Sequence, residues 1–316
     1  MESEGTDCQA FGPQSTHIGF IGLGTMGKPM AMNLVHAGYS LMVGDLKEDA
    51  VKEVVAAGAQ AGSNKEICSF ADVLILMLPA GPIVQSVLFG TKAAGGSISH
   101  SCAAARLHPG AMVCDMSSVK PSESRACRDL LAQEGVSFMD APVSGGEKGA
   151  IEGKLAIMCG GKEADFEKMQ PIFQVLGSSA VRIGDCGAGS VCKLTNQMIV
   201  ADTTAAICEA FIFAVKAGAD PECVYQAIRG GAAGSVVLDM KLPQMLAHDF
   251  TPPSAAAAIL HKDVANCLDA AHEVASPVPY TAQTFEILQS MKAEGMLDED
   301  FAAMIRHFEQ LGNCRL

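Results

Sequence analysis

Short apolar runs alternate with helical segments through the first half of the chain. Five runs lack the polar alternation of a half-exposed strand, and they cover residues 17–22, 40–45, 72–78, 111–116 and 136–141. Strands that are covered on both faces show this pattern. Amphipathic stretches such as 48–58 and 123–135 separate the runs and complete a strand–helix alternation. The pattern predicts an open parallel α/β sheet up to about Gly184.

The pattern changes between Gly187 and Ala217, where the chain has no proline, few charges and apolar residues nearly all round. Gly218 then stands where a helix-ending glycine is expected, and Asp220-Pro221 fits the start of the next helix. A helix of about 30 residues is about 45 Å long, too long for one small domain. We therefore expect a connecting helix that leads into an all-helical domain. Its apolar circumference predicts burial on all sides, with a partner subunit covering part of it.

Three segments follow from these patterns. We expect a mobile, polar tail at residues 1–16, a parallel α/β domain at residues 17–184 and an all-helical domain at residues 185–316. The tail lacks the basic end and apolar run of a signal peptide. We also expect no apolar run of the roughly 18 residues that a membrane span needs. These features predict a soluble, cytoplasmic protein.

Composition excludes some partners. The 316 residues carry a formal net charge of −13, which makes the chain a poor partner for nucleic acid or for an anionic membrane. The 12 cysteines form no CxxC pair, and the histidines show no metal-ligand spacing, so neither a disulfide framework nor a metal site is indicated.

A glycine-rich turn follows the first predicted strand and precedes a helix. It is GLGTMG, made of Gly22, Leu23, Gly24, Thr25, Met26 and Gly27. Such a turn brings backbone N–H groups and a helix N-terminus close to a pyrophosphate, so it predicts a dinucleotide site. The alternative is a plain strand–helix turn.

Asp45 ends the second predicted strand, 18 residues after Gly27. A carboxylate there accepts hydrogen bonds from the adenosine ribose and repels a 2′-phosphate. The next residue is Leu46 rather than an arginine, which favours NAD over NADP. Lys47 weakens that preference because it could reach a phosphate, and Asp45 could also be an ordinary solvated turn residue.

Two further segments carry candidate chemistry. Ser144, Gly145 and Gly146 follow a strand end directly, where a hydroxyl and unhindered N–H groups suit a carboxylate, although an ordinary glycine turn has the same sequence. Lys193 lies within about two turns of a helix start in a nearly apolar helix. The helix dipole and burial both disfavour its cationic form, so it could exchange a proton with a substrate oxygen. The alternative is a surface lysine.

The ordered motifs resemble those of the β-hydroxyacid dehydrogenase family, over nearly everything from Ile18 to Leu311. The matching segments are GFIGLGTMGKPMAMNL, MLP at 77–79, DMSS at 115–118, DAPVSGG at 140–146, GAGSVCKLTNQ at 187–197 and KD at 262–263. Within the family, the chain looks most like reductases of tartronate semialdehyde (2-hydroxy-3-oxopropionate). Dehydrogenases of 3-hydroxyisobutyrate usually carry KxxNN, whereas Gln197 ends the motif here.

The resemblance implies that residues 17–184 form a Rossmann-like NAD(P)-binding domain, and it implies roles for individual residues. It implies that Lys193 is catalytic. It places at the substrate Ser118, Ser144, Gly145, Gly146, Asn196 and Gln197. It places at the cofactor the turn Gly22–Gly27 together with Asp45, Leu78, Pro79, Ser118 and Lys262.

The resemblance also implies a reaction. The expected reaction is the reversible NAD(P)-dependent reduction of 2-hydroxy-3-oxopropionate, a small carboxylate, to glycerate. The apolar circumference of the long helix separately favours a homo-oligomer joined through the helical domain. One alternative is a dehydrogenase of 3-hydroxyisobutyrate or another short β-hydroxyacid, and another is a non-catalytic dinucleotide-binding oligomerisation module. The family often has an aromatic residue where Ala255 stands, and related reductases have Asp at Ala258, so substrate identity stays open.

Overall fold

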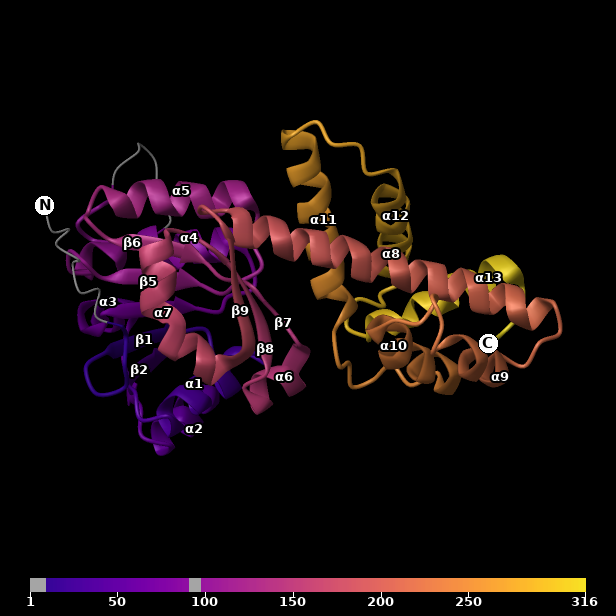
Figure 1. Cartoon of the computed structure of the whole chain (residues 1–316), viewed down its shortest axis with the longest axis horizontal. Helices are drawn as coiled ribbons and strands as arrows, with labels where there is room; N and C mark the ends of the chain where they lie inside the picture. The colour runs from indigo at the N-terminus through magenta and orange to yellow at the C-terminus, as the bar shows by residue number, and fades with distance from the viewer. Residues whose placement is uncertain (1–9, 91–97) are drawn as a thin grey trace, which may run out of the picture. The chain divides into compact units, whose positions relative to one another are not determined.

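The computed structural model of the chain describes residues 10–90 and 98–316. They form two compact units, Met1–Lys193 and Leu194–Leu316, each of which is described by itself below. Figure 1 traces the elements in order from the N-terminus to the C-terminus.

The first unit is a sheet covered by helices. Its strands are β1 (His17–Ile21), β2 (Ser40–Gly44), β3 (Gln60–Ala61), β4 (Val73–Leu76), β5 (Met112–Asp115), β6 (Ser137–Asp140), β7 (Val143–Ser144), β8 (Leu155–Gly160) and β9 (Gly177–Gly184). Its helices are α1 (Gly27–His36), α2 (Glu48–Ala56), α3 (Asn64–Phe70), α4 (Gly81–Phe89), η1 (Ala104–Arg106), α5 (Pro121–Ala132), α6 (Gly146–Glu152) and α7 (Glu163–Leu176).

The described strands join in the order β3-β2-β1-β4-β5-β6-β8-β7, and β9 also pairs with β8. From β3 to β6 every pairing is parallel, while β8 runs antiparallel to β6 and β7. Helices α1, α2, α6 and α7 contribute to one apolar core, and α3, α4 and α5 contribute to the other, so both faces of the sheet are covered. This explains why the strands are continuous apolar runs. The prediction of a Rossmann-like parallel sheet is confirmed.

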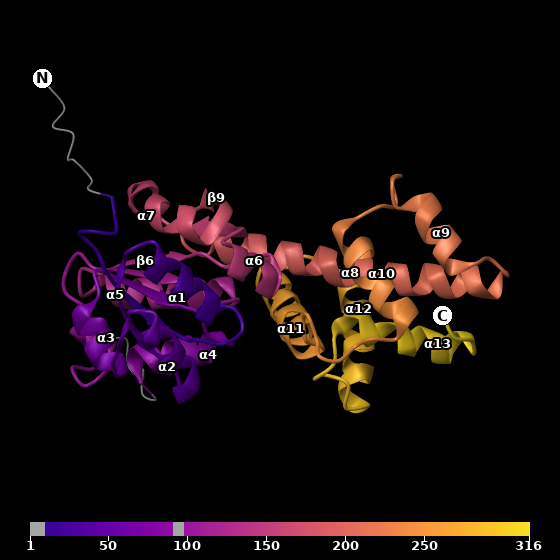
Figure 2. The ribbon, with the colours of Figure 1, turned by 90° about the horizontal axis from the view of Figure 1, so that it is seen from below.

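The second unit is helical. A long helix, α8 (Ala188–Lys216), begins in the first unit and continues into the second. The other helices are α9 (Pro221–Ile228), α10 (Val236–Ala247), α11 (Ala257–Glu273), α12 (Pro279–Ala293), η2 (Phe301–Met304) and α13 (Ile305–Gly312). Helices α11 and α12 lie side by side, as both Figure 1 and Figure 2 show. The prediction of an all-α second part reached through a long helix is confirmed.

The predicted helix end at Gly218 and the predicted helix start at Asp220 are both confirmed. Gly218 adopts a positive φ of 84°, and the side chain of Asp220 caps α9 by accepting from the N–H of Cys223 at 2.8 Å. The expected burial on all sides does not hold for the single chain. Along α8 the side chains of Val191, Ile199 and Phe213 are exposed, whereas Ala201, Cys208 and Phe211 of the same helix are buried in the core of the second unit.

Two other expectations need correction. Residues 10–16 are not a mobile tail: Phe11 packs on the core, its N–H bonds to the carbonyl of Lys168 at 3.0 Å, and its own carbonyl accepts from the Tyr39 hydroxyl at 3.0 Å. Residues 1–9 of that predicted tail lie outside the described residues. This contact could not be predicted from the sequence, because the partners of Phe11 lie in distant parts of the chain.

The apolar length of α8 also differs from the expectation. Within the described part of the chain it is the one helix long and apolar enough, by length and composition, to cross a membrane, with a mean hydropathy of 1.8 over 18 residues. The expectation that no apolar run reaches that length is therefore wrong. A core helix of a soluble protein meets the same criterion, and Asp202 on α8 accepts hydrogen bonds from Thr281 and Thr284 of α12 at 2.9 and 2.7 Å.

Candidate active site

The glycine-rich turn connects the carboxyl end of β1 to α1, and its glycines differ in how closely other atoms approach them. A Cβ atom on Gly22 would lie 2.3 Å from the carbonyl oxygen of Met77, and one on Gly27 would lie 1.9 Å from that of Gly22, so protein packing requires both glycines. A Cβ on Gly24 would meet nothing within 4 Å. Gly24 is therefore not needed by the protein's own packing, and the space above it is open to a ligand that approaches the backbone.

The start of α1 beside this turn is also suited to an anion. The residue before the helix, the N-cap Met26, makes no capping hydrogen bond through its side chain, and the first turn contains no acidic residue. Thr25 is exposed, whereas the Leu23 side chain is buried in the core. A helix N-terminus with these properties favours a pyrophosphate. The residues present therefore fit the dinucleotide that the turn predicts.

Asp45 lies just beyond β2 and is tied to the turn. Its carboxylate accepts from the N–H of Leu23 at 2.5 Å and from the N–H of Lys47 at 2.7 Å. It is thus more than a solvated turn residue, because it braces the glycine-rich turn. It also lines a cavity of about 410 Å³, formed by Val43, Gly44, Asp45, Glu48, Val51, Lys52, Ala61 and Gly62. This cavity lies at the carboxyl ends of β2 and β3, where the adenosine half of a dinucleotide binds in such sheets.

Two other cofactor candidates, Leu78 and Pro79, follow β4. The N–H of Leu78 bonds to the hydroxyl of Ser117 at 2.9 Å, and the N–H of Ser117 bonds to Asp115 at 3.0 Å. Ser117 is buried and Ser118 is half-buried, so Ser117 joins the loops after β4 and β5 while Ser118 is the more accessible of the two. The sequence motif did not separate these roles. Burial raises the pKa of Asp115 to about 7.

The segment Ser144–Gly146 runs from the end of β7 into α6. Ser144 pairs with Ala156 of β8 and is half-buried. Gly145 and Gly146 take positive φ values of 137° and 61°, and a Cβ on Gly146 would meet nothing within 4 Å. The backbone therefore turns sharply beside open space, an arrangement that leaves room for a small carboxylate near Ser144.

Lys193 lies on the second turn of α8 and is half-buried. The first turn of that helix is held by Asp140, the last residue of β6. Its carboxylate accepts from the N–H of Gly187 and from the N–H of Ser190, each at 2.7 Å. The motifs DAPVSGG and GAGSVCKLTNQ, which are far apart in the sequence, are thereby joined at the carboxyl edge of the sheet.

The remaining candidates lie in the second unit and form a chain of contacts. Asn196 donates to the side-chain oxygen of Gln197 at 2.9 Å, and Gln197 donates to Asp263 at 2.6 Å. The other oxygen of Asp263 lies 2.9 Å from Nζ of Lys262. Asp263 is buried and was given no role from the sequence, although the KD pair at 262–263 pointed to it.

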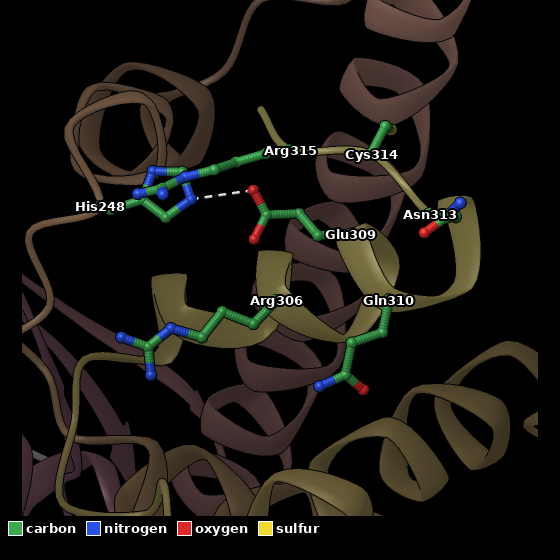
Figure 3. Close-up of a pocket in the computed structure, with 7 residues that line it drawn as sticks. All are labelled: His248, Arg306, Glu309, Gln310, Asn313, Cys314 and Arg315. Carbon is green, nitrogen blue, oxygen red and sulfur yellow. Dashed lines mark hydrogen bonds and ion pairs between the residues drawn. The ribbon is translucent and has the colours of Figure 1, made fainter.

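A second and larger cavity is separate from all of these residues. It measures about 710 Å³ and is formed by the end of α10 and the C-terminal residues, as Figure 3 shows. His248 lies 2.8 Å from Glu309 in its wall. No predicted site residue lines it, so it is not the predicted site. Within residues 10–90 and 98–316, no group of three His, Cys, Asp or Glu side chains could hold a metal ion.

Comparison with protein families accounts for both parts of the chain. Residues 17–184 match the NAD binding domain of 6-phosphogluconate dehydrogenase. Residues 187–308 match the family described as NAD-binding of NADP-dependent 3-hydroxyisobutyrate dehydrogenase. The chain belongs to the β-hydroxyacid dehydrogenase family. It is therefore an NAD(P)-dependent oxidoreductase that acts on CH–OH groups, as the motif order predicted.

Individual relatives differ in their substrates. The chain is 37% identical over 299 residues to 2-(hydroxymethyl)glutarate dehydrogenase of Eubacterium barkeri, with 94% of this chain and 96% of the relative covered. It is 38% identical to 2-hydroxy-3-oxopropionate reductase of Escherichia coli strain K12, with 95% and 99% covered. The solved Mycobacterium tuberculosis 3-hydroxyisobutyrate dehydrogenase with L-serine is 30% identical, with a TM-score of 0.83 and with 92% and 98% covered. The family is one of soluble enzymes, so the apolar character of α8 is that of a core helix.

Proposed function

We propose that this β-hydroxyacid dehydrogenase catalyses the reversible reduction of 2-hydroxy-3-oxopropionate to glycerate, with Lys193 as general acid and base. The observation that carries the proposal is the junction at Asp140. It fixes the helix of Lys193 to the strand that leads to Ser144–Gly146, and so ties a proton donor to a segment suited to a carboxylate. The similarity to 2-hydroxy-3-oxopropionate reductase over 95% of the chain supports this substrate.

When bound, NADH supplies the hydride for this chemistry. The ammonium group of Lys193 donates a proton to the carbonyl oxygen as the aldehyde is reduced, and the neutral amine takes that proton back in the oxidation of glycerate. The Ser144 hydroxyl and the N–H groups of Gly145 and Gly146 hold the carboxylate of the substrate. Ser118, Asn196 and Gln197 complete the binding of its polar groups.

The proposal extends to the cofactor. Asp45 and Glu48 both line the cavity beside β2, and Leu46 offers no positive charge, so a 2′-phosphate would meet two carboxylates against the cation of Lys52. We therefore propose that NAD is preferred over NADP. Lys262 is proposed to contact the cofactor, along with Leu78 and Pro79.

We also propose that the enzyme is a cytoplasmic homo-oligomer joined through its helical part. The exposed Ile199 and Phe213 support this, because large apolar side chains on a long helix are typical of a surface that a second copy covers. Sedimentation equilibrium on the purified chain tests it. A monomer at micromolar concentration would contradict it.

A steady-state screen tests the substrate. The panel contains 2-hydroxy-3-oxopropionate in the reducing direction, and glycerate, 3-hydroxyisobutyrate, 2-(hydroxymethyl)glutarate, L-serine and L-threonate in the oxidising direction, each with both cofactors. The proposal expects the highest kcat/KM for the 2-hydroxy-3-oxopropionate and glycerate pair. A tenfold preference for 3-hydroxyisobutyrate would replace it with the nearest alternative. Dinucleotide binding without turnover of any substrate would favour the non-catalytic module.

A further inference from the structure

Asp140 is a fully buried carboxylate for which the proposed chemistry has no direct use. It ends β6, and its two oxygens accept the N–H groups of Gly187 and Ser190, 47 and 50 residues further along the chain. The first N–H groups of a helix have no partner within the helix. Asp140 thus supplies the cap that α8 does not take from its own sequence, since Gly187 stands at the helix start and has no side chain.

The surrounding backbone is built to admit this cap. A Cβ on Gly189 would lie 2.3 Å from the carbonyl oxygen of Met158 and 2.5 Å from that of Asp140. Only a glycine lets the first turn of α8 approach the strands so closely. Ser190 is also held from the side, because its hydroxyl lies 3.0 Å from that of Ser124 on α5. The position of the turn is therefore set by contacts on two sides, and Lys193 follows Ser190 by three residues, about one turn of helix.

Buried thiols and a second carboxyl surround Asp140. Burial raises the pKa of Cys159 and of Cys186 to about 12, so both thiols are neutral near pH 7, and burial raises the pKa of Cys114 as well. Asp115 pairs with Asp140 in strand register, and burial raises the pKa of Asp115 to about 7.

Burial also raises the pKa of Asp140, but the N–H donors of Gly187 and Ser190 oppose that rise because they favour the ionised form. The guanidinium group of Arg125 lies beside the same turn. A Cβ atom built on Gly187 would be only 2.8 Å from its Nη1.

We propose that Asp140 is a positioning residue for Lys193: its carboxylate fixes the first turn of α8 and, in its ionised form, supplies a negative charge that supports the protonated lysine. This inference rests on the proposed role of Lys193. The positive end of a helix dipole disfavours a cation in the first turns, and an ionised carboxylate at that end offsets it. Asp140 thereby keeps Lys193 able to act as an acid during reduction.

Two variants separate geometry from charge. Asp140→Asn keeps the size of the side chain but loses the charge and one of the two acceptors. We expect kcat for reduction to fall about tenfold. We expect the high-pH limb of its pH profile to move to lower pH by roughly half to one unit, as expected for loss of a charge about one to two helical turns away. Asp140→Glu keeps the charge but displaces the turn, so kcat falls while the limb stays close to that of the wild type.

KM for NADH is expected to stay within about twofold in both variants, because neither touches the turn Gly22–Gly27. Asp165→Asn, which neutralises another buried acid on α7, is the matched control and leaves the profile in place. A profile and kcat for Asp140→Asn that match the wild type would overturn the inference. Lys193→Ala is measured in the same assay. If Lys193→Ala keeps its turnover, the proposed function is wrong. If Lys193→Ala loses its turnover but Asp140→Asn matches the wild type, only the inference about Asp140 is wrong.

A measurement on the wild-type protein covers the case in which Asp140→Asn does not fold. Amide hydrogen exchange at Gly187 and Ser190 is expected to be slow, at least a hundredfold below that of exposed amides, because both N–H groups are bonded to a buried carboxylate. Exchange at the rate of an uncapped first turn would overturn the inference.

Discussion

Gln197 donates a hydrogen bond to Asp263 across 2.6 Å, and both side chains are buried. The contact joins two helices of the second unit, α8 and α11. It also links a residue proposed for the substrate to the neighbour of Lys262, which is proposed for the cofactor. The amide at position 197 is therefore held in one orientation, because Asn196 donates a hydrogen bond to its oxygen.

Replacing Gln197 with Asn tests this contact. The shorter side chain no longer reaches Asp263, and a buried carboxylate that loses a donor costs about 1–3 kcal/mol. We expect kcat/KM to fall about tenfold, with a higher KM for the hydroxyacid. Gln226→Asn is the matched control, since Gln226 bonds to Glu222 on an exposed face. An unchanged kcat/KM in Gln197→Asn would show that Asp263 does not orient the amide.

Removal of the amine of Lys193 tests the central chemical proposal. Lys193→Ala is expected to lower kcat by about 10²–10⁴ while NADH still binds, the range typical of a positioned proton donor. Rapid-quench turnover and fluorescence titration with NADH measure the two effects separately. Lys216→Ala removes a lysine from the other end of the same helix and is expected to keep its turnover. Near wild-type turnover in Lys193→Ala would remove the proposed mechanism.

Cofactor choice is expected to follow the charges beside β2. The ratio of kcat/KM for NADH over NADPH should exceed one in the wild type and fall about tenfold in Leu46→Arg, because an arginine there pairs with a 2′-phosphate. Glu48→Gln should lower the ratio further when combined with it. Asp49→Asn, in the same turn of α2 but not part of the cavity wall, is the control. A native preference for NADPH would show that Lys47 or Lys52 outweighs the two carboxylates.

The sequence predicted the features that depend on neighbours along the chain. Strand runs, the glycine-rich turn, the helix stop at Gly218 and the cap at Asp220 are local patterns, and the structure has them where they were expected. The packing of Phe11 and the bonds of Asp140 depend on partners tens of residues away, and no local pattern reveals them. The same limit applies to Asp263, whose motif was visible but whose partner Gln197 was not.

Stability should depend on pH through Asp115. Burial raises its pKa to about 7, so the folded protein binds this proton more tightly than the unfolded chain, whose carboxyl has the ordinary value of 3.8. The contribution of Asp115 to stability is therefore greatest at low pH and is lost as pH rises from about 4 to about 7.

Asp115→Asn cannot ionise, so relative to the wild type it should gain on the order of 1–3 kcal/mol between pH 5 and pH 8. Urea unfolding at a series of pH values measures this difference, with the exposed Asp298→Asn as the baseline. A stability difference between wild type and Asp115→Asn that does not change with pH would show that Asp115 stays ionised in the folded state.

The helical unit should depend on a buried ion pair. Lys241 is fully buried, and its Nζ contacts the two oxygens of Asp300 at 2.8 and 3.0 Å while lying 4.0 Å above the ring of Phe301. Asp300 also accepts from the N–H groups of Ser254 and Ala255, each at 3.0 Å, and so holds the segment in front of α11, the helix of Lys262. Burial opposes the charge of Asp300, but its bonds to Lys241 and to these donors hold its pKa below the usual value.

Lys241→Met leaves Asp300 charged and without its cation. Because a broken buried pair is much worse than none, we expect a loss of about 3–5 kcal/mol, whereas Lys241→Met combined with Asp300→Asn should recover a large part of it. Without the lysine the pKa of Asp300 rises, so the defect of the single variant should shrink as pH falls and the carboxyl becomes protonated. Urea unfolding at pH 5 and pH 8 gives both quantities, with Lys292→Met, an exposed lysine on α12, as the control. A single variant that loses less than about 1 kcal/mol at pH 8 would mean that water replaces the lysine, and that the segment before α11 is held by its backbone bonds alone.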